Sequence, residues 1–132
     1  MARLRVVALD ARLPGWAEQA CAEYAKRMPR GYEVSRIHAR KGKLESFLKG
    51  HVVALDERGK DLTTVRFAKL LERETVFVIG GADGLDEGVK KDAALVLRLS
   101  SLTLPYALAQ VVLLEQIYRA ATLLTGHPYH RA

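Results

Sequence analysis

Short apolar runs alternate along the chain with longer segments in which apolar side chains recur every three or four positions. Runs that are β-branched or alternate with polar residues, as is typical of strands, lie at 3–9, 32–38, 51–56 and 75–81. Helical spacing predicts helices over 14–28, about 63–73 and 107–125. Shorter helices are expected at 43–49 and from 85 onward, whereas 94–105 mixes strand and loop features.

This alternation of strands and helices predicts an α/β domain with a mostly parallel sheet and helices on both faces. The 132 residues contain no internal repeat, no low-complexity stretch and no Pro/Gly-rich linker, so a single domain over 1–132 is expected. In such sheets, ligands bind beyond the carboxyl ends of the strands. The places to search for a site are therefore 53–56, 80–84 and 99–105, each of which ends or follows a predicted strand.

Composition is that of a soluble intracellular protein, with 49% hydrophobic and 27% charged residues. The first residues lack the long apolar core of a signal peptide, and no apolar run approaches the length of a bilayer span. We therefore expect no membrane partner and a cytoplasmic location. The lone Cys21 cannot form an internal disulfide, and no Cys and His residues have zinc spacing, so no metal is expected.

The formal net charge of +6 comes from one segment of the chain. Residues 26–43 hold one acid, Glu33, and seven bases: Lys26, Arg27, Arg30, Arg36, Arg40, Lys41 and Lys43. The rest of the chain is formally neutral. Such a regional surplus suggests contact with a polyanion, although a solvated surface is an equally good interpretation of a charge run.

Two loops could approach a ligand closely. IGGADG (79–84) has glycines at 80, 81 and 84, which permit positive φ angles and expose the backbone N–H groups. The loop is neither GxGxxG nor a Walker A motif, and a tight turn explains it equally well. LSSLTLP (99–105) has hydroxyl groups beside apolar neighbours and could contact a ligand. It could equally be a buried connector between two elements. Neither loop decides the function alone.

Taken together, the motifs resemble a known family. VALDERGK (53–60), FVIGGADGL (77–85), LSSLTLPYALAQVVLLEQIYRA (99–120) and HPYHRA (127–132) occur in the order seen in the RlmH family of bacterial 23S rRNA pseudouridine N3-methyltransferases. EYAKR (23–27) matches the same family, so the resemblance covers nearly the full chain.

This resemblance implies a SPOUT-class domain with a C-terminal trefoil knot, in which about 75–132 bind S-adenosylmethionine. It implies a homodimer with active sites near the subunit interface. The substrate would be N3 of a pseudouridine in a stem-loop of 23S rRNA within the assembled ribosome. Carried over by position, the cofactor contacts are Leu55, Gly80, Leu99, Ser100, Ser101, Leu102, Thr103 and Leu104, with Gly81 and Gly84 shaping the loop.

The last residues, GHPYHRA (126–132), form either a frayed tail or a strap that returns to a site. The resemblance favours the strap, with Tyr129, His130 and Arg131 on the substrate side. Methylation at N3 requires loss of a proton and stabilisation of charge on O2 or O4. His130 could accept that proton, Arg131 or Arg119 could donate to a ring oxygen, and Tyr129 could stack on the base.

Several of these residues also have structural explanations. His127 suits a helix terminus, and Arg119 forms an i, i+4 pair with Glu115. We keep Arg119 as a possible RNA contact, together with the candidates of the basic segment: Arg30, Arg36, Arg40, Lys41 and Lys43.

The chain also departs from the family pattern. Tyr106 stands where histidine is common, Gln110 where arginine is common, and Ala82 where a small residue or proline occurs. The chain is also shorter than its relatives between 40 and 51. A second hypothesis is therefore an RNA-binding or ribosome-associated factor that has lost methyl transfer. A nucleotide-binding hydrolase ranks third, because the glycine loop lacks a Walker lysine.

Overall fold

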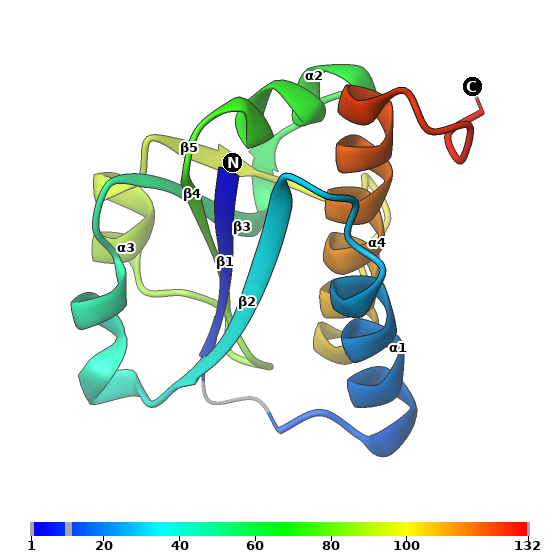
Figure 1. The fold of residues 1–132 in the computed structure, drawn as a ribbon. Helices are drawn as coiled ribbons and strands as arrows, with labels where there is room; N and C mark the ends of the chain where they lie inside the picture. The colour runs from blue at the N-terminus through cyan, green and yellow to red at the C-terminus, as the bar shows by residue number, and fades with distance from the viewer. Residues whose placement is uncertain (1, 10–11, 132) are drawn as a thin grey trace.

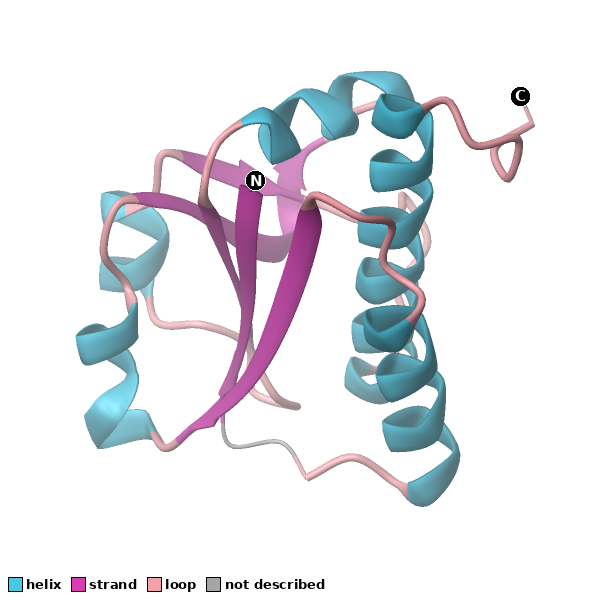
Figure 2. Ribbon diagram, in the orientation of Figure 1, coloured by secondary structure: helices cyan, strands magenta, loops and turns pink. Residues whose placement is uncertain are grey.

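The sheet organises the molecule. In the computed structural model, which describes residues 2–9 and 12–131, five strands form one sheet in the order β2-β1-β4-β3-β5. All four strand pairs are parallel. The strands are β1 (Ala2–Leu9), β2 (Tyr32–Ala39), β3 (His51–Lys60), β4 (Thr75–Ile79) and β5 (Leu95–Leu97). Their carboxyl ends therefore meet along one edge (Figures 1 and 2).

Helices cover both faces of this sheet, as predicted. One face carries the long helices α1 (Gly15–Lys26) and α4 (Tyr106–Thr125), together with α2 (Thr64–Ala68) and the 3-10 helix η2 (Lys69–Glu72). The other face carries the 3-10 helix η1 (Lys41–Phe47) and α3 (Glu87–Asp92) (Figure 1). The α/β class with a parallel sheet is confirmed.

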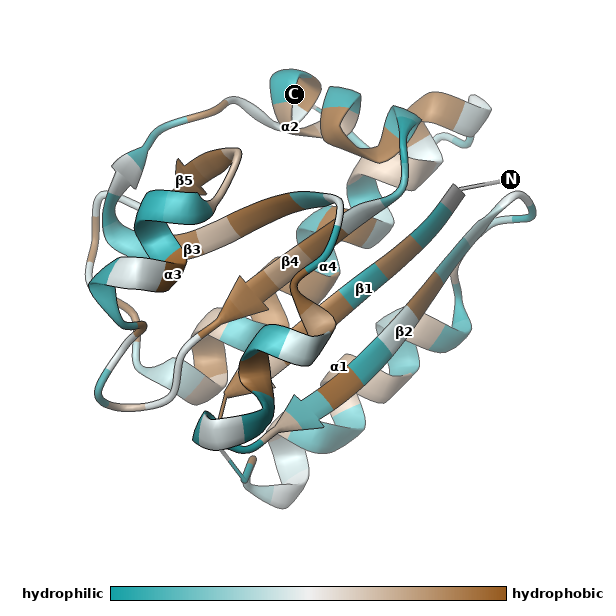
Figure 3. Cartoon of the chain, turned by 90° about the vertical axis from the view of Figure 1, so that its left-hand side faces the viewer, coloured by the Kyte–Doolittle hydropathy of each residue, from teal (hydrophilic) through white to brown (hydrophobic). Residues whose placement is uncertain are grey.

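The residue pattern explains the two cores. Strand side chains point alternately to opposite faces. In β1, Leu4 and Val6 join the core under α1 and α4, and Val7 joins the core under η1 and α3. β4 is buried at every position because it lies in the middle of the sheet, and its apolar colour in Figure 3 contrasts with the alternation along β1 and β2.

Several element boundaries differ from the prediction. β3 continues to Lys60 instead of ending at 56, with an irregular register between Leu55 and Lys60 where it passes β5. The helix predicted over 63–73 divides into α2 and η2 at Ala68. α1 ends at Lys26 because Pro29 disfavours helical backbone in the residue before it.

The length of α4 corrects the expectation that no apolar segment approaches the length of a bilayer span. This helix is long and apolar enough to cross a membrane by length and composition, because its 20 residues include only two charged ones, Glu115 and Arg119. It packs against α1 and α2, and Leu113, Leu114 and Ile117 are fully buried. Its apolar face thus serves the protein core.

Candidate functional site

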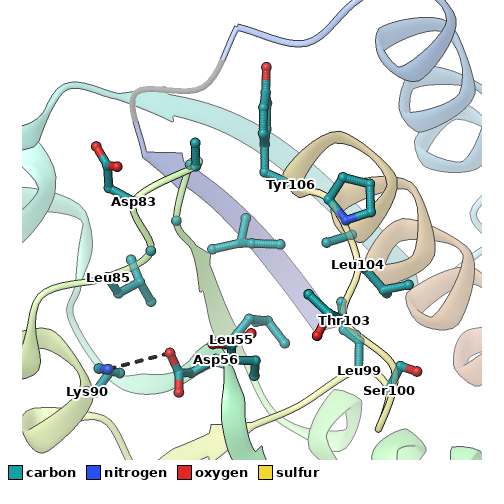
Figure 4. Close-up of a pocket in the computed structure, with 18 of the residues that line it drawn as sticks. Leu55, Asp56, Asp83, Leu85, Lys90, Leu99, Ser100, Thr103, Leu104 and Tyr106 are labelled. Atoms are coloured by element: carbon teal, nitrogen blue, oxygen red, sulfur yellow. Dashed lines mark hydrogen bonds and ion pairs between the residues drawn. The ribbon is translucent and has the colours of Figure 1, made fainter.

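A cavity of about 670 Å³ opens at the carboxyl edge of the sheet (Figure 4). Residues 55–57 of β3 and the segments after β4 and β5 converge on it, and the start of α4 closes one side. The three segments that the sequence marked as places for a site, 53–56, 80–84 and 99–105, thus line a single cavity. Its size falls within the range of small-molecule and cofactor sites, which is roughly 300–1,000 Å³.

Nine of the ten residues predicted to contact a cofactor line this cavity. They are Leu55, Gly80, Gly81, Gly84, Leu99, Ser100, Leu102, Thr103 and Leu104. Ser101 is not among the lining residues. The Ser100 hydroxyl accepts a hydrogen bond from the Leu102 amide at 2.9 Å, so it shapes the third loop.

The glycine loop is a tight turn that faces the cavity. The Gly84 amide donates to the Gly81 carbonyl at 3.0 Å, and Gly84 has φ +74°. A Cβ on Gly80 would lie 2.5 Å from the carbonyl carbon of Gly84, closer than real Cβ contacts. Both interpretations of the motif therefore hold: the glycines make the turn, and the turn leaves bare backbone beside the hollow.

Charged residues of the cavity were missed at the sequence level. Four acids and one base line it: Asp56, Glu57, Asp83, Glu87 and Lys90. The Lys90 ammonium lies 3.0 Å from a Glu87 oxygen and 3.4 Å from an Asp56 oxygen. Asp56 could have been found, since it directly follows the apolar run of β3. Lys90 could not, because only the tertiary fold brings α3 to this edge. The surplus of acid suits a ligand with positive charge.

Tyr106 begins α4 and points from the cavity toward the segment after β1 (Figure 4). Its hydroxyl donates to the carbonyl of Arg12 at 3.2 Å. Tyr106 thereby ties the start of α4 to the start of the α1 segment.

The C-terminal residues fold back against α4. Gly126 ends the helix with φ +79°, and the His127 amide donates to the Thr122 carbonyl at 2.9 Å, as in a Schellman motif. The His127 ring then accepts from the Tyr129 amide at 3.2 Å. The helix-terminal role considered for His127 is the one that the structure shows.

A polar cluster fixes the strap. The Tyr129 hydroxyl donates to Glu115 at 2.8 Å, and its ring packs edge-on against Tyr118 with centroids 4.7 Å apart. The Arg119 guanidinium lies 4.8 Å from the centre of the Tyr129 ring and donates to Glu115 at 2.7 Å. It also contacts Nδ1 of His130 at 3.2 Å. These contacts argue against a frayed tail.

The cluster shifts the pKa values of Glu115, Arg119 and Tyr129, and the hydrogen bond to Glu115 raises that of Arg119. Burial would raise the pKa of Glu115, but hydrogen bonds from Arg119 and Tyr129 outweigh it, and the pKa is lowered. Burial, together with the hydrogen bond to Glu115, raises the pKa of Tyr129 to about 12.

The strap and the cavity lie apart within one chain. The strap contacts Glu115, Tyr118 and Arg119, whereas the cavity involves α4 only at Tyr106 and Ala109. At a rise of 1.5 Å per residue, 106 and 119 are roughly 20 Å apart along the axis. Figure 1 shows the tail leaving the end of α4 opposite to its start. The chain alone does not bring Tyr129 and His130 to the cavity, and Arg131 is exposed beyond them.

The basic segment is divided in space. Arg30 precedes β2. After β2, Arg40 comes directly before η1, and Lys41 and Lys43 lie in η1. All four side chains are exposed. The eight residues of β2 span about 25 Å, so these charges lie at opposite ends of the strand. Arg36 is half-buried and forms a two-pronged ion pair with Glu18. Only the group Arg40, Lys41 and Lys43 shares the carboxyl edge with the cavity.

Within residues 2–9 and 12–131, no three His, Cys, Asp or Glu side chains are grouped so that they could hold a metal ion. Cys21 is buried, and its burial raises the pKa of the thiol.

Comparisons with known proteins agree with this geometry. The sequence profile of the family described as "Predicted SPOUT methyltransferase" matches residues 2–130. The chain is 42% identical over 153 positions to Ribosomal RNA large subunit methyltransferase H of Dechloromonas aromatica, covering 98% of both chains. At least 21 of those positions are gaps in the 132-residue chain, so this relative is longer, as expected.

Solved structures show the same fold. The SpoU methyltransferase AviRb of Streptomyces viridochromogenes, in complex with the cofactor AdoMet, superposes with a TM-score of 0.60 at 14% identity. This match covers 93% of the chain and 58% of AviRb. An AdoMet-bound rRNA methyltransferase of Sinorhizobium meliloti gives a TM-score of 0.55 at 14% identity, covering 89% of the chain and 56% of that protein. The chain spans somewhat more than half the length of these two structures.

Proposed function

Because the chain belongs to the SPOUT methyltransferases, and among them to the ribosomal RNA large subunit methyltransferase H (RlmH) family, we propose that it methylates 23S rRNA with S-adenosylmethionine as the methyl donor. The acceptor atom in this proposal is N3 of a pseudouridine in the assembled ribosome. Residues 1–132 act as one cytoplasmic catalytic domain, with a trefoil knot in the region 75–132.

The observation that carries the proposal is the convergence of the three loops on one cavity of cofactor size. The residues present fit S-adenosylmethionine. Leu55, Leu99 and Leu104 offer apolar surface for an adenine, and the bare backbone at Gly80 allows close approach. The surplus of carboxylates suits the positive charges of the sulfonium and amino groups, and Lys90 can pair with the carboxylate.

S-adenosylmethionine supplies an electrophilic methyl group on a sulfonium sulfur. The chain's own residues must orient the uracil ring, remove the N3 proton and stabilise charge on O2 or O4. A guanidinium always donates, so the contact with Arg119 makes Nδ1 of His130 an acceptor. A neutral His130 then carries its proton on Nε2 and donates to a ring oxygen. To accept the N3 proton at Nδ1, His130 would first have to leave Arg119.

A homodimer resolves the separation of strap and cavity. We place Tyr129, His130 and Arg131 of one protomer at the cofactor cavity of its partner. Trp16 and Leu108, large apolar side chains exposed near the starts of α1 and α4, provide surface for such an interface.

The position of the cavity at the carboxyl edge of the sheet also indicates which basic residues contact the RNA. Arg40, Lys41 and Lys43 are exposed at the carboxyl edge, where they can meet phosphates flanking the acceptor nucleotide. Arg30 and Arg36 are weaker candidates for RNA contacts. Arg30 lies at the end of β2 away from the cavity, and Arg36 is paired with Glu18. Arg119 reaches the RNA only together with the strap.

The test uses the purified full chain, labelled S-adenosylmethionine and ribosomes from cells that lack the corresponding methyl group. We expect one methyl group on one nucleotide of 23S rRNA, assigned by mass spectrometry to N3 of a pseudouridine. Methyl transfer to another position would refute the assigned acceptor.

A non-catalytic RNA-binding factor is the alternative, motivated by Gln110 in place of a family arginine. It predicts ribosome binding without calorimetric binding of S-adenosylmethionine. Measurable cofactor binding therefore separates the two functions.

A further inference from the structure

A chain of hydrogen bonds joins α2 to the side chains that hold the strap. α2 packs beside the second half of α4 (Figure 1), where the Thr64 hydroxyl donates to Oε1 of Gln116 at 2.8 Å. Nε2 of Gln116 donates to Oε1 of Glu115 at 2.7 Å. Glu115 in turn accepts from Arg119 and Tyr129. Thr64 and Gln116 are half-buried, and neither lines the cofactor cavity.

The direction of these bonds follows from the chemistry of the groups. A carboxylate only accepts, so Gln116 must turn its NH2 group toward Glu115 and its carbonyl oxygen away from it. The carbonyl oxygen then needs a donor, and the Thr64 hydroxyl supplies one. An amide turned the other way would bring two acceptors together. Partners on two different helices therefore hold the Gln116 amide in one orientation.

The two oxygens of Glu115 have different partners. Oε1 accepts from Gln116 at 2.7 Å, whereas Nε of Arg119 lies 3.4 Å away from it. Oε2 accepts from Nε and Nη2 of Arg119 at 3.0 and 2.7 Å, and from Tyr129 at 2.8 Å. The Glu115 and Arg119 side chains are only 18% and 24% exposed, so water competes weakly for these bonds.

This arrangement differs from the frequent pairing of arginine with a carboxylate, in which two nitrogens each take an oxygen of their own. In Glu115, Gln116 occupies the oxygen that Nε of Arg119 would take in that pairing. The guanidinium is tilted onto the other oxygen, and its Nη1 lies 3.2 Å from Nδ1 of His130.

We propose that Gln116, held by Thr64, is a positioning residue for methyl transfer. By occupying Oε1 of Glu115, it sets the tilt of the Arg119 guanidinium and keeps Nη1 within reach of His130. The guanidinium always donates, so this contact places the proton of the neutral imidazole on Nε2. This inference rests on the proposed function, in which Nε2–H of His130 donates to the substrate at the partner's cavity.

NMR of the histidine rings in the full chain measures the tautomer directly. The nitrogen shifts of a ring show which nitrogen carries the proton at about pH 8.5, where imidazoles are neutral. The chain has four histidines, and the signals missing from His130→Gln belong to His130. In the wild type we expect its proton on Nε2. In Gln116→Met, which keeps a similar volume without the amide, we expect a mixture of both tautomers.

Methyl transfer should respond in the same way. Gln116→Met and Thr64→Val are expected to lower the single-turnover rate about tenfold with cofactor and ribosomes saturating, because a misplacement of about 1 Å can cost roughly a hundredfold. Thr64→Ser keeps the hydroxyl and should react as the wild type does. Thr63→Val removes the cap bond to the Arg66 amide at the same end of α2, so it is the control for a destabilised helix and should keep its rate.

The titration of Tyr129 separates positioning of the guanidinium from docking of the strap. Burial and the hydrogen bond to Glu115 raise the pKa of Tyr129 to about 12. Both remain in Gln116→Met, whose Tyr129 should therefore still titrate at about 12. A value near 10.0 in this variant would contradict the inference, because Gln116 would then dock the whole strap.

The inference is overturned if the His130 signals of Gln116→Met match those of the wild type, or if its transfer rate equals or exceeds the wild-type rate. The wild-type spectrum decides even if a variant fails to fold, since a proton on Nδ1 would exclude the Arg119 contact. The ring signals need no methyl transfer, so the two proposals fail separately. A tautomer that follows Gln116 without rRNA methylation refutes the proposed function alone, whereas normal methylation by Gln116→Met refutes this inference alone.

Discussion

At the scale of single residues, Gly80 is the position where the cavity tolerates no side chain. A Cβ there would lie 2.5 Å from the Gly84 backbone, so the turn must move. We expect Gly80→Ala to lower the free energy of unfolding by about 1–3 kcal/mol and to weaken S-adenosylmethionine binding at least tenfold. Urea unfolding and calorimetry measure the two effects.

The control for that substitution is Gly88→Ala in α3. A Cβ on Gly88 meets nothing within 4 Å, and its backbone is helical. Alanine there should leave cofactor affinity unchanged and stabilise slightly, because glycine is a poor helix former. Equal cofactor affinity in both variants would show that the glycine turn does not hold the cofactor.

His130 allows its two roles to be separated. If Nε2–H donates to the substrate, His130→Gln retains a donor amide and should keep clearly more methyl transfer than His130→Ala. If the ring is the base, the two variants should be equally impaired, since an amide accepts no proton. The comparison is made as single-turnover rates with cofactor and ribosomes saturating.

At the scale of elements, the strap is held to α4 by ionisation states that pH can reverse. The pKa of Tyr129 is raised from 10.0 to about 12, so its contribution to docking is complete below pH 10 and is lost as pH rises through 12. The pKa of Glu115 is lowered from 4.5, so its contribution is present above pH 4.5 and is lost as pH falls through the lower folded value.

Tyrosinate absorbance measures this directly. The difference between the wild type and Tyr129→Phe should titrate at about 12. Glu115→Gln should bring that value down toward 10.0, because the hydrogen-bonding anion is gone. A Tyr129 that titrates at its ordinary value in the wild type would contradict a docked strap.

The η1 segment makes a separate prediction about salt. Charge reversal of Arg40 and Lys41 should reduce the slope of log affinity for ribosomes against log salt by about one per lost phosphate contact. Reversal of Lys26 and Arg27, at the end of α1, is the matched control. These residues belong to the same basic run but lie beyond β2 from the cavity edge, farther than a Debye length of about 10 Å. An equal change of the salt slope in the two double variants would show that Arg40 and Lys41 do not contact RNA phosphates.

Periodicity was enough to predict the elements and the place of the cavity. Apolar runs such as 75–79 must be central strands, and parallel strands present their loops on one edge, so the segments 53–56, 80–84 and 99–105 were expected to lie together. The individual cofactor residues within them, such as Leu55, Gly80 and Leu99, were expected only from the family resemblance. Side-chain partners between elements were beyond reach. The approach of Lys90 to Asp56 and the pairing of Arg36 with Glu18 depend on how helices sit on the sheet. The basic segment was treated as one surface although it contains the predicted strand 32–38, whose length places Arg30 and Arg40 at opposite ends.

At the scale of the whole molecule, the central claim is that the cofactor cavity of one protomer works with the strap of another. The most direct measurement mixes two defective chains, Gly80→Ala and a chain truncated after His127, under conditions that allow subunit exchange and at a cofactor concentration that leaves the Gly80→Ala cavity empty. In a twofold dimer, half of the molecules become hybrids, each with one intact cavity facing one intact strap. Methyl transfer should recover to about a quarter of the wild-type rate. Recovery no greater than the sum of the separate chains would contradict the account.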